Sequence, residues 1–117
     1  MVAVLAVQPG CLIVAAGAAG ASTVAYVRGD LMAPLDADYE SAVKASRRAL
    51  DKLEFKIIDE KRDALAADFV ARTALDKKVQ VRVTKQGEKV TQIRIRVGVF
   101  GDEALSMTVL NEIKQRL

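Results

Sequence analysis

The sequence contains no histidine and no tryptophan, and Cys11 is its single cysteine. An intramolecular disulfide is therefore impossible, and a zinc or other soft-metal site lacks its usual ligands. Acid–base chemistry and catalytic triads that depend on histidine are excluded as well. We therefore expect the protein not to be an enzyme and to use no metal or cofactor.

Aromatic residues and excess charge are also scarce. Aromatics make up 4% of the sequence, and Lys+Arg 18 against Asp+Glu 15 leaves a net charge of +3. Nucleic-acid binders usually carry a dense basic stripe and aromatic platforms for stacking bases, and this sequence has neither. We expect no nucleic-acid partner, and no small-molecule substrate is evident. The length of 117 residues suffices for one domain with a core.

Charged side chains are missing from the N-terminal quarter. From Val2 to Val27 there is no Asp, Glu, Lys or Arg, and Cys11 is the one cysteine, whereas charged residues are frequent from Arg28 onward. This boundary predicts two regions. Residues 1–28 are expected to form a membrane anchor with a small-residue spacer, and residues 29–117 a globular domain.

The apolar region divides at Pro9-Gly10, immediately before Cys11. A lipoprotein signal ends in a short apolar stretch and a small residue before a cysteine that receives a diacylglycerol. Gly10-Cys11 fits that ending and predicts lipidation of Cys11, although Gln8 and Pro9 differ from the residues usual at their positions. Several acyl chains anchor stably, at about 0.8 kcal/mol per buried CH₂.

Other readings of residues 12–27 stay open. This run is rich in Ala and Gly and is just short of a typical span, so it is also a candidate for a plain helical anchor with an incidental cysteine. In a soluble chain it would instead be buried. Ala16 and Gly20 have the small-xxx-small spacing that permits close helix packing. A structural anchor that self-associates through this segment is therefore the alternative function.

The region after Arg28 shows the periodicities of an α+β fold. Asp30 to Leu35 reads as a short strand, where Pro34 favours an edge position. Asp36 or Asp38 can cap a helix that begins at Tyr39. The apolar and small residues of this helix follow the i, i+3, i+4 rule and are Tyr39, Ala42, Val43, Ser46, Ala49, Leu50 and Leu53.

Four segments with period two follow, and a second helix ends the chain. The inward residues of the segments are Phe55 and Ile57; Leu65, Ala67, Phe69 and Ala71; Val79, Val81 and Val83; and Ile93, Ile95, Val97 and Val99. Asp102 can cap the last helix, whose apolar stripe includes Leu105, Val109 and Ile113. The predicted order of strand, helix, four strands, helix gives an antiparallel sheet of about five strands with both helices on one face.

The outer sheet face is the best candidate for function. Arg72, Arg82, Arg94 and Arg96 would gather there if the strands pair as consecutive hairpins. Such a patch is suited to anionic lipid head groups or to an acidic envelope protein. The alternative is an ordinary solvated face, where Asp68 or Glu88 offsets the charge.

The chain resembles a family of small uncharacterised bacterial envelope lipoproteins. The resemblance lies in Gly10-Cys11, in Tyr26-Val27-Arg28-Gly29-Asp30-Leu31 and above all in Ile95-Arg96-Val97-Gly98-Val99-Phe100-Gly101-Asp102-Glu103. It implies a domain of unknown function held at the bacterial envelope through Cys11, with no catalytic residues or cofactor.

Within the C-terminal signature we expect the glycines to form a tight turn and Phe100 to plug the end of the core. Together these observations predict a membrane-tethered binding or assembly module, with the globular domain in the periplasm.

Overall fold

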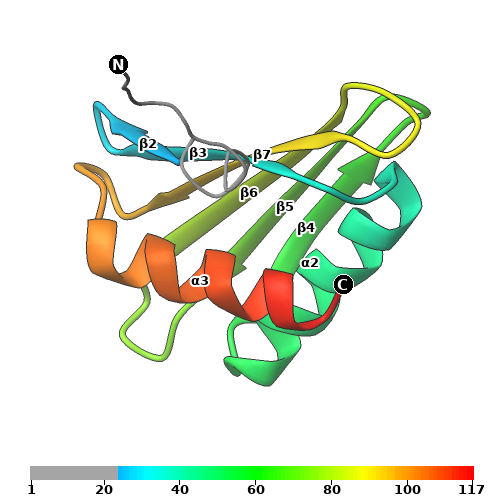
Figure 1. Ribbon diagram of the computed structural model, residues 1–117. Helices are drawn as coiled ribbons and strands as arrows, with labels where there is room; N and C mark the ends of the chain where they lie inside the picture. Colours follow the sequence, from blue (N-terminus) through cyan, green and yellow to red (C-terminus); the bar gives the residue numbers. More distant parts are fainter. Residues whose placement is uncertain (1–23) are drawn as a thin grey trace, which may run out of the picture.

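The computed structural model describes residues 24–117, which form one antiparallel sheet with two helices on one face (Figure 1). The predicted α+β class is confirmed, with six strands in place of about five. The predictions for Cys11 and for the small-residue run lie outside the described residues. The elements are β2 (Ala25–Val27), β3 (Asp30–Leu35), α2 (Tyr39–Lys52), β4 (Lys56–Arg62), β5 (Ala66–Arg72), β6 (Lys78–Lys85), β7 (Thr91–Val97) and α3 (Glu103–Gln115).

The sheet has the order β2-β3-β7-β6-β5-β4, and every neighbouring pair is antiparallel. β4 to β7 therefore form a meander of consecutive hairpins, as the sequence predicts. β3 lies beside β7, although the two strands are far apart in the sequence. Leu31 of β3 pairs with Ile95 of β7. This long-range pairing closes the sheet over the core.

β2 is the additional strand, and it lies in the region predicted to be the anchor. It pairs with β3 through a two-residue turn in which Arg28 (φ 54°) and Gly29 (φ 89°) both have positive φ. Two consecutive positive φ values are typical of the type I′ turn that matches the twist of a hairpin. The apolar Tyr26 packs against the core from this strand.

β3 is not an edge strand, because it lies between β2 and β7. The expectation from Pro34 is therefore wrong for the strand as a whole. β2 pairs only with Asp30 to Met32, so Pro34 lies beyond the last residue that β2 reaches. A proline can be accommodated there, since no strand hydrogen bond to β2 needs its missing N–H.

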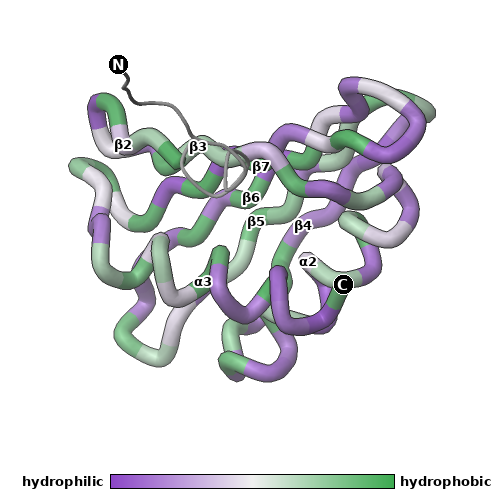
Figure 2. The backbone as a smooth tube through the Cα atoms, viewed as in Figure 1, coloured by the Kyte–Doolittle hydropathy of each residue, from purple (hydrophilic) through white to green (hydrophobic). Residues whose placement is uncertain are grey.

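The core lies between the sheet and the helices, as alternation predicts. Phe69, Ile93, Ile95, Leu110 and Ile113 are among the largest fully buried side chains. Figure 2 shows hydrophobic and hydrophilic residues alternating along the strands. Small residues on α2, where Ala42, Ala45 and Ala49 are buried, let α3 pack close beside it.

Both helices begin at the predicted aspartates. The Asp38 carboxylate accepts a hydrogen bond from the Ser41 N–H at 3.2 Å, and Asp102 accepts one from the Leu105 N–H at 3.0 Å. These bonds satisfy N–H groups that have no partner within the helix. Between residues 24 and 117, neither helix has the length and apolar character needed to cross a bilayer.

Candidate functional site

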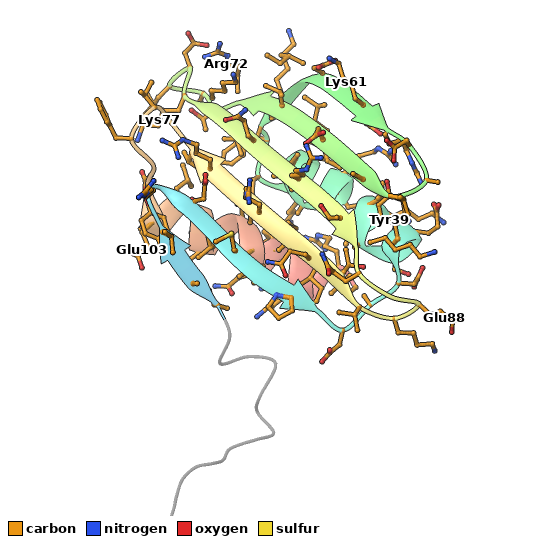
Figure 3. All side chains as sticks on the ribbon, turned by 90° about the horizontal axis from the view of Figure 1, so that it is seen from above. Tyr39, Lys61, Arg72, Lys77, Glu88 and Glu103 are labelled. Atoms are coloured by element: carbon orange, nitrogen blue, oxygen red, sulfur yellow. The ribbon has the colours of Figure 1, made fainter. Side chains whose placement is uncertain are left out.

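The outer face of the sheet is not covered by a helix and carries polar side chains (Figure 3). Along β5 to β7 the buried residues alternate with exposed or partly exposed ones that point to this face. Cations outnumber anions here. The outward cations are Lys56, Lys61, Arg72, Lys78, Arg82, Arg94 and Arg96, and the outward anions are Asp30, Asp59 and Asp68.

Two arginines lie directly opposite each other at the centre of this face. Arg82 on β6 pairs in register with Arg94 on β7 and, on its other side, with Asp68 on β5. Arg82 contacts both carboxylate oxygens of Asp68 at 3.1 Å. Like charges opposed across strands destabilise each other, and one carboxylate balances only one of the two arginines.

Among the four arginines of the outer face, Arg94 is the one that has no anionic partner in the described part of the chain. Its guanidinium lies 3.9 Å from the sulfur of Met32, and it takes part in none of the ion pairs within residues 24–117. The residues outside that range contain no carboxylate side chain. The side chain of Arg94 is therefore available to an external anion.

A hollow of about 400 Å³ runs across the same face beside Arg94. The charged residues that line it are Asp30, Asp59, Lys61, Asp68, Arg82, Arg94 and Arg96. The lining therefore contains both cations and carboxylates, and Gln80 adds a neutral amide. The hollow is therefore suited to a ligand with a pattern of charges rather than to a single anion.

Arg96 and Arg72 have structural partners instead. Arg96 donates to the carbonyl oxygens of Arg28 at 2.8 Å and Val99 at 2.5 Å and also pairs with Asp30 at 3.2 Å. Arg72 donates to the Asp76 carbonyl at 3.1 Å. The four predicted arginines do lie on the outer face, but only Arg82 and Arg94 are immediate neighbours.

Lys61 also lines the hollow, although it is not among the site residues predicted from the sequence. β4 continues through Arg62, so Lys61 pairs in register with Asp68 on the outer face. The run Lys61-Arg62-Asp63 looked like turn composition, which concealed the end of the strand. Alternation counted from the outward Lys56 places Lys61 on the inner face, and only the bulge between Ile57 and Asp59, which shifts the pattern by one residue, brings it to the outer face.

The loop after β7 departs from its predicted packing. Gly98 (φ 76°) and Gly101 (φ 88°) form the expected turn, and Asp102 caps α3. Phe100, however, is 90% exposed, so the prediction that it plugs the core is wrong. The physical reason is that the two glycines turn the backbone away from the core, leaving Val99 and Phe100 directed to solvent.

Ser106 and the sequence neighbours Asp59 and Glu60 are further polar residues of the described chain. Ser106 is completely buried, and its hydroxyl has no hydrogen-bond partner among the described residues. Asp59 and Glu60 point to opposite faces of β4, where Glu60 pairs with Arg47 of α2. In the part of the chain from residue 24 onward, no group of three or more acidic, histidine or cysteine residues is placed to hold a metal ion.

Comparison with known proteins gives a family match without an activity. The family described as "Protein of unknown function (DUF3568)" matches residues 1–116, which is nearly the whole sequence. No curated protein matches the chain.

Proposed function

The chain belongs to the family of unknown function DUF3568, and we propose that it is a membrane-tethered binding module of the bacterial cell envelope. In this proposal the region before β2 attaches the protein to the membrane through a lipid on Cys11. The globular domain faces the periplasm and binds an acidic segment of another envelope protein on its outer sheet face.

The observation that carries the binding role is the opposition of Arg82 and Arg94. Asp68 neutralises Arg82, whereas Arg94 has no carboxylate. A carboxylate from a partner would relieve the repulsion between the two guanidinium groups and could form the paired hydrogen bonds that arginine favours. The same carboxylate would be within the hollow that Lys61 lines.

The charges of the hollow favour a polypeptide over a flat anionic surface. Asp30, Asp59 and Asp68 line the hollow together with the cations. A uniform layer of anionic head groups would meet these carboxylates as well as the arginines. A protein segment can instead place acidic side chains at Arg94 and Lys61 and donors near the aspartates, because complementary charge patterns provide specificity.

Charge reversal tests the binding role. A photo-crosslinking residue in place of Gln80, which lines the hollow, should link the full-length protein to a partner in intact cells. We expect the double variant Arg94→Glu and Lys61→Glu to lose this product, since both changes repel an acidic segment. Lys89→Glu makes the same change of charge in the exposed β6–β7 turn and should retain it.

The result against the proposal is a crosslinked product that persists in the double variant. If that persistent product is the protein linked to itself, the self-associating anchor is favoured instead. Arg96 is left unchanged in this experiment, because its hydrogen bonds to Arg28 and Val99 join two loops. Its reversal would confuse loss of binding with loss of structure.

The tether is tested by the intact mass of the protein from the membrane fraction. Lipidation of Cys11 would remove the ten residues before it and add acyl groups, so the mass should differ from that of the full sequence by both changes. The variant Cys11→Ala should keep its full mass. A wild-type mass equal to that of the unprocessed chain would refute the lipoprotein part of the proposal.

A further inference from the structure

One end of the domain presents large apolar side chains to solvent on two neighbouring loops. Leu75 in the β5–β6 loop is 86% exposed, and Val99 and Phe100 in the β7–α3 loop are 78% and 90% exposed. Single exposed apolar residues are common on protein surfaces, but a cluster of them marks an interaction site. We call Leu75, Val99 and Phe100 the apolar tip.

The tip has a defined backbone. The Gly98 N–H donates to the Lys78 carbonyl at 2.8 Å, and Arg96 donates to the Val99 carbonyl. Gly101 packs so tightly on the β2–β3 turn that a Cβ there would lie 2.4 Å from the Cα of Gly29. The loop is therefore fixed from both sides, and its outward apolar side chains are a built feature of the fold.

A second hollow, of about 600 Å³, adjoins the tip. Val99 and Phe100 form its apolar lining, and Arg72, Lys77 and Lys78 supply cations. Figure 3 shows Arg72 and Lys77 at this end of the sheet. Arg72 and Lys77 pair with Asp76 and Asp102, whereas Lys78 forms none of the ion pairs between residues 24 and 117. Apolar groups beside available cations match the boundary between lipid tails and anionic head groups.

The N-terminal region joins the domain close to the same end. β2 has three residues, so Ala25 is within about 10 Å of the Arg28-Gly29 turn that contacts Gly101. Figure 1 shows the β2–β3 hairpin beside the loop that leads into α3. Residues 2–27 contain no Asp, Glu, Lys or Arg, and this apolar stretch continues into the described domain at Ala25, near the tip.

We propose that the apolar tip docks on an anionic phospholipid surface. Leu75, Val99 and Phe100 enter the interface, while a head-group phosphate occupies the second hollow against Lys78 and Arg72. The sheet is then oriented with the C-terminal end of β7 toward the lipid. The face around Arg94 remains open to a protein partner. This inference rests on the proposed membrane tether and adds how the tethered domain is oriented.

The absence of tryptophan from the sequence allows a direct test. The full-length variant Phe100→Trp, reconstituted in phosphatidylcholine vesicles containing phosphatidylglycerol, reports the tip through its only tryptophan. We expect its emission to shift to the blue and to be quenched when the lipids carry brominated acyl chains. Leu65→Trp is the matched control, because this exposed residue precedes β5 at the opposite end from Leu75; its emission should stay unquenched.

The contribution of charge is tested with Lys78→Glu in the Phe100→Trp background. The added carboxylate should reduce the quenching to the level in pure phosphatidylcholine. In a separate Leu75→Trp reporter, Phe100→Ala should lower the docked population about tenfold or more, since a buried aromatic ring is lost.

Flotation of the vesicles separates failure of the tether from failure of the inference. A protein that does not float with the vesicles refutes the tether. If the protein floats but the tryptophan at position 100 is not quenched by brominated lipid, tip docking is wrong. A blue shift without quenching that disappears on dilution would assign the tip to contact with a second copy instead. Quenching that Lys78→Glu leaves unchanged would overturn the head-group contact.

Discussion

Gly29 and Gly101 bring two turns of the domain into close contact. Both have positive φ, and a Cβ at Gly101 would come within 2.4 Å of the Gly29 Cα and 2.5 Å of the Tyr26 hydroxyl. The atoms in the way belong to the backbone and to a ring, which cannot rotate aside. Position 101 therefore requires glycine for two separate reasons, which are its positive φ and the lack of space for a Cβ.

Gly101→Ala is expected to destabilise the protein more than the same change at the other glycines of the outer turns. The positive φ alone costs about 1–3 kcal/mol, and the steric contact adds to it. Gly98→Ala is the matched control: it has φ 76° but nothing within 4 Å of the added Cβ, so it should show the φ cost alone. Urea unfolding of both variants gives the comparison. Equal losses would mean that the contact with Gly29 contributes nothing.

Arg96 and Arg94 show that residue type alone does not define a binding residue. They occupy successive outward positions on β7, yet the guanidinium of Arg96 donates hydrogen bonds to Arg28, Asp30 and Val99. Arg94 meets only the Met32 sulfur. The difference follows from position, since Arg96 lies near the end of the strand where two loops offer carbonyl oxygens, whereas Arg94 lies between strands whose carbonyls are already paired.

Among the elements, β4 is an edge strand that two ion pairs join to α2. Most of its residues are exposed, and a bulge interrupts its pairing between Ile57 and Asp59. On the inner face Glu60 pairs with Arg47 of α2, and Arg62 pairs with Glu40 at 2.6 Å. The Arg47 hydrogen bond holds the pKa of Glu60 below its ordinary value. Charges and a bulge also discourage another strand from adding to this edge.

Glu60→Gln should loosen β4 with little effect on the whole fold. The pair with Arg47 is partly exposed, so its loss should lower the free energy of unfolding by about 1 kcal/mol or less. Amide hydrogen exchange is the sharper measurement, and the β4–β5 hydrogen bonds should exchange faster than in the wild type. Asp59→Asn is the control, because it removes the same charge from the outer face of β4. Asp59 forms no ion pair in the described chain. Exchange that accelerates equally in both variants would argue against the pairing.

The elements that could be predicted from sequence are those with local signals. α2 and α3 have aspartate caps and apolar stripes, and β5, β6 and β7 alternate with period two. β2 could not be predicted, because its three residues continue the apolar composition of the sequence before them and their pairing depends on the Arg28-Gly29 turn. The exposure of Phe100 depends on the packing of Gly101 against Gly29, which is distant in sequence and leaves no periodic signal.

The candidate site was predictable as a face but not as a set of contacts. Alternation alone places Arg82 and Arg94 on the outer side of the sheet. Their direct opposition depends on the register of the β6–β7 hairpin, in which Lys85 pairs with Thr91. A shift of that register would place Arg94 beside another residue, so the unmatched charge appears only once the pairing is known.

For the whole molecule, the distribution of titratable groups predicts a simple dependence of stability on pH. With no histidine, no side chain of residues 24–117 has an ordinary pKa between about 5 and 8. Hydrogen bonds to the carboxylates lower the pKa of Asp38, Asp63 and Asp102; the main donors are Ser41, the Leu65 N–H and the Leu105 N–H, respectively. For Asp102, Lys77 also contributes.

We expect the free energy of unfolding to be constant from about pH 6 to 8 and to fall below about pH 4. The unfolded chain has the higher carboxyl pKa values and binds protons first, so acid favours unfolding. The stabilisation by these carboxylates is fully present above their pKa in the unfolded state. It is lost as the pH falls through their pKa in the folded state. Urea unfolding across this range measures the profile. Asp102→Asn keeps a capping side chain but cannot titrate, so its deficit relative to the wild type should be largest near neutral pH and shrink in acid. A deficit independent of pH would show that the charge of Asp102 does not stabilise α3.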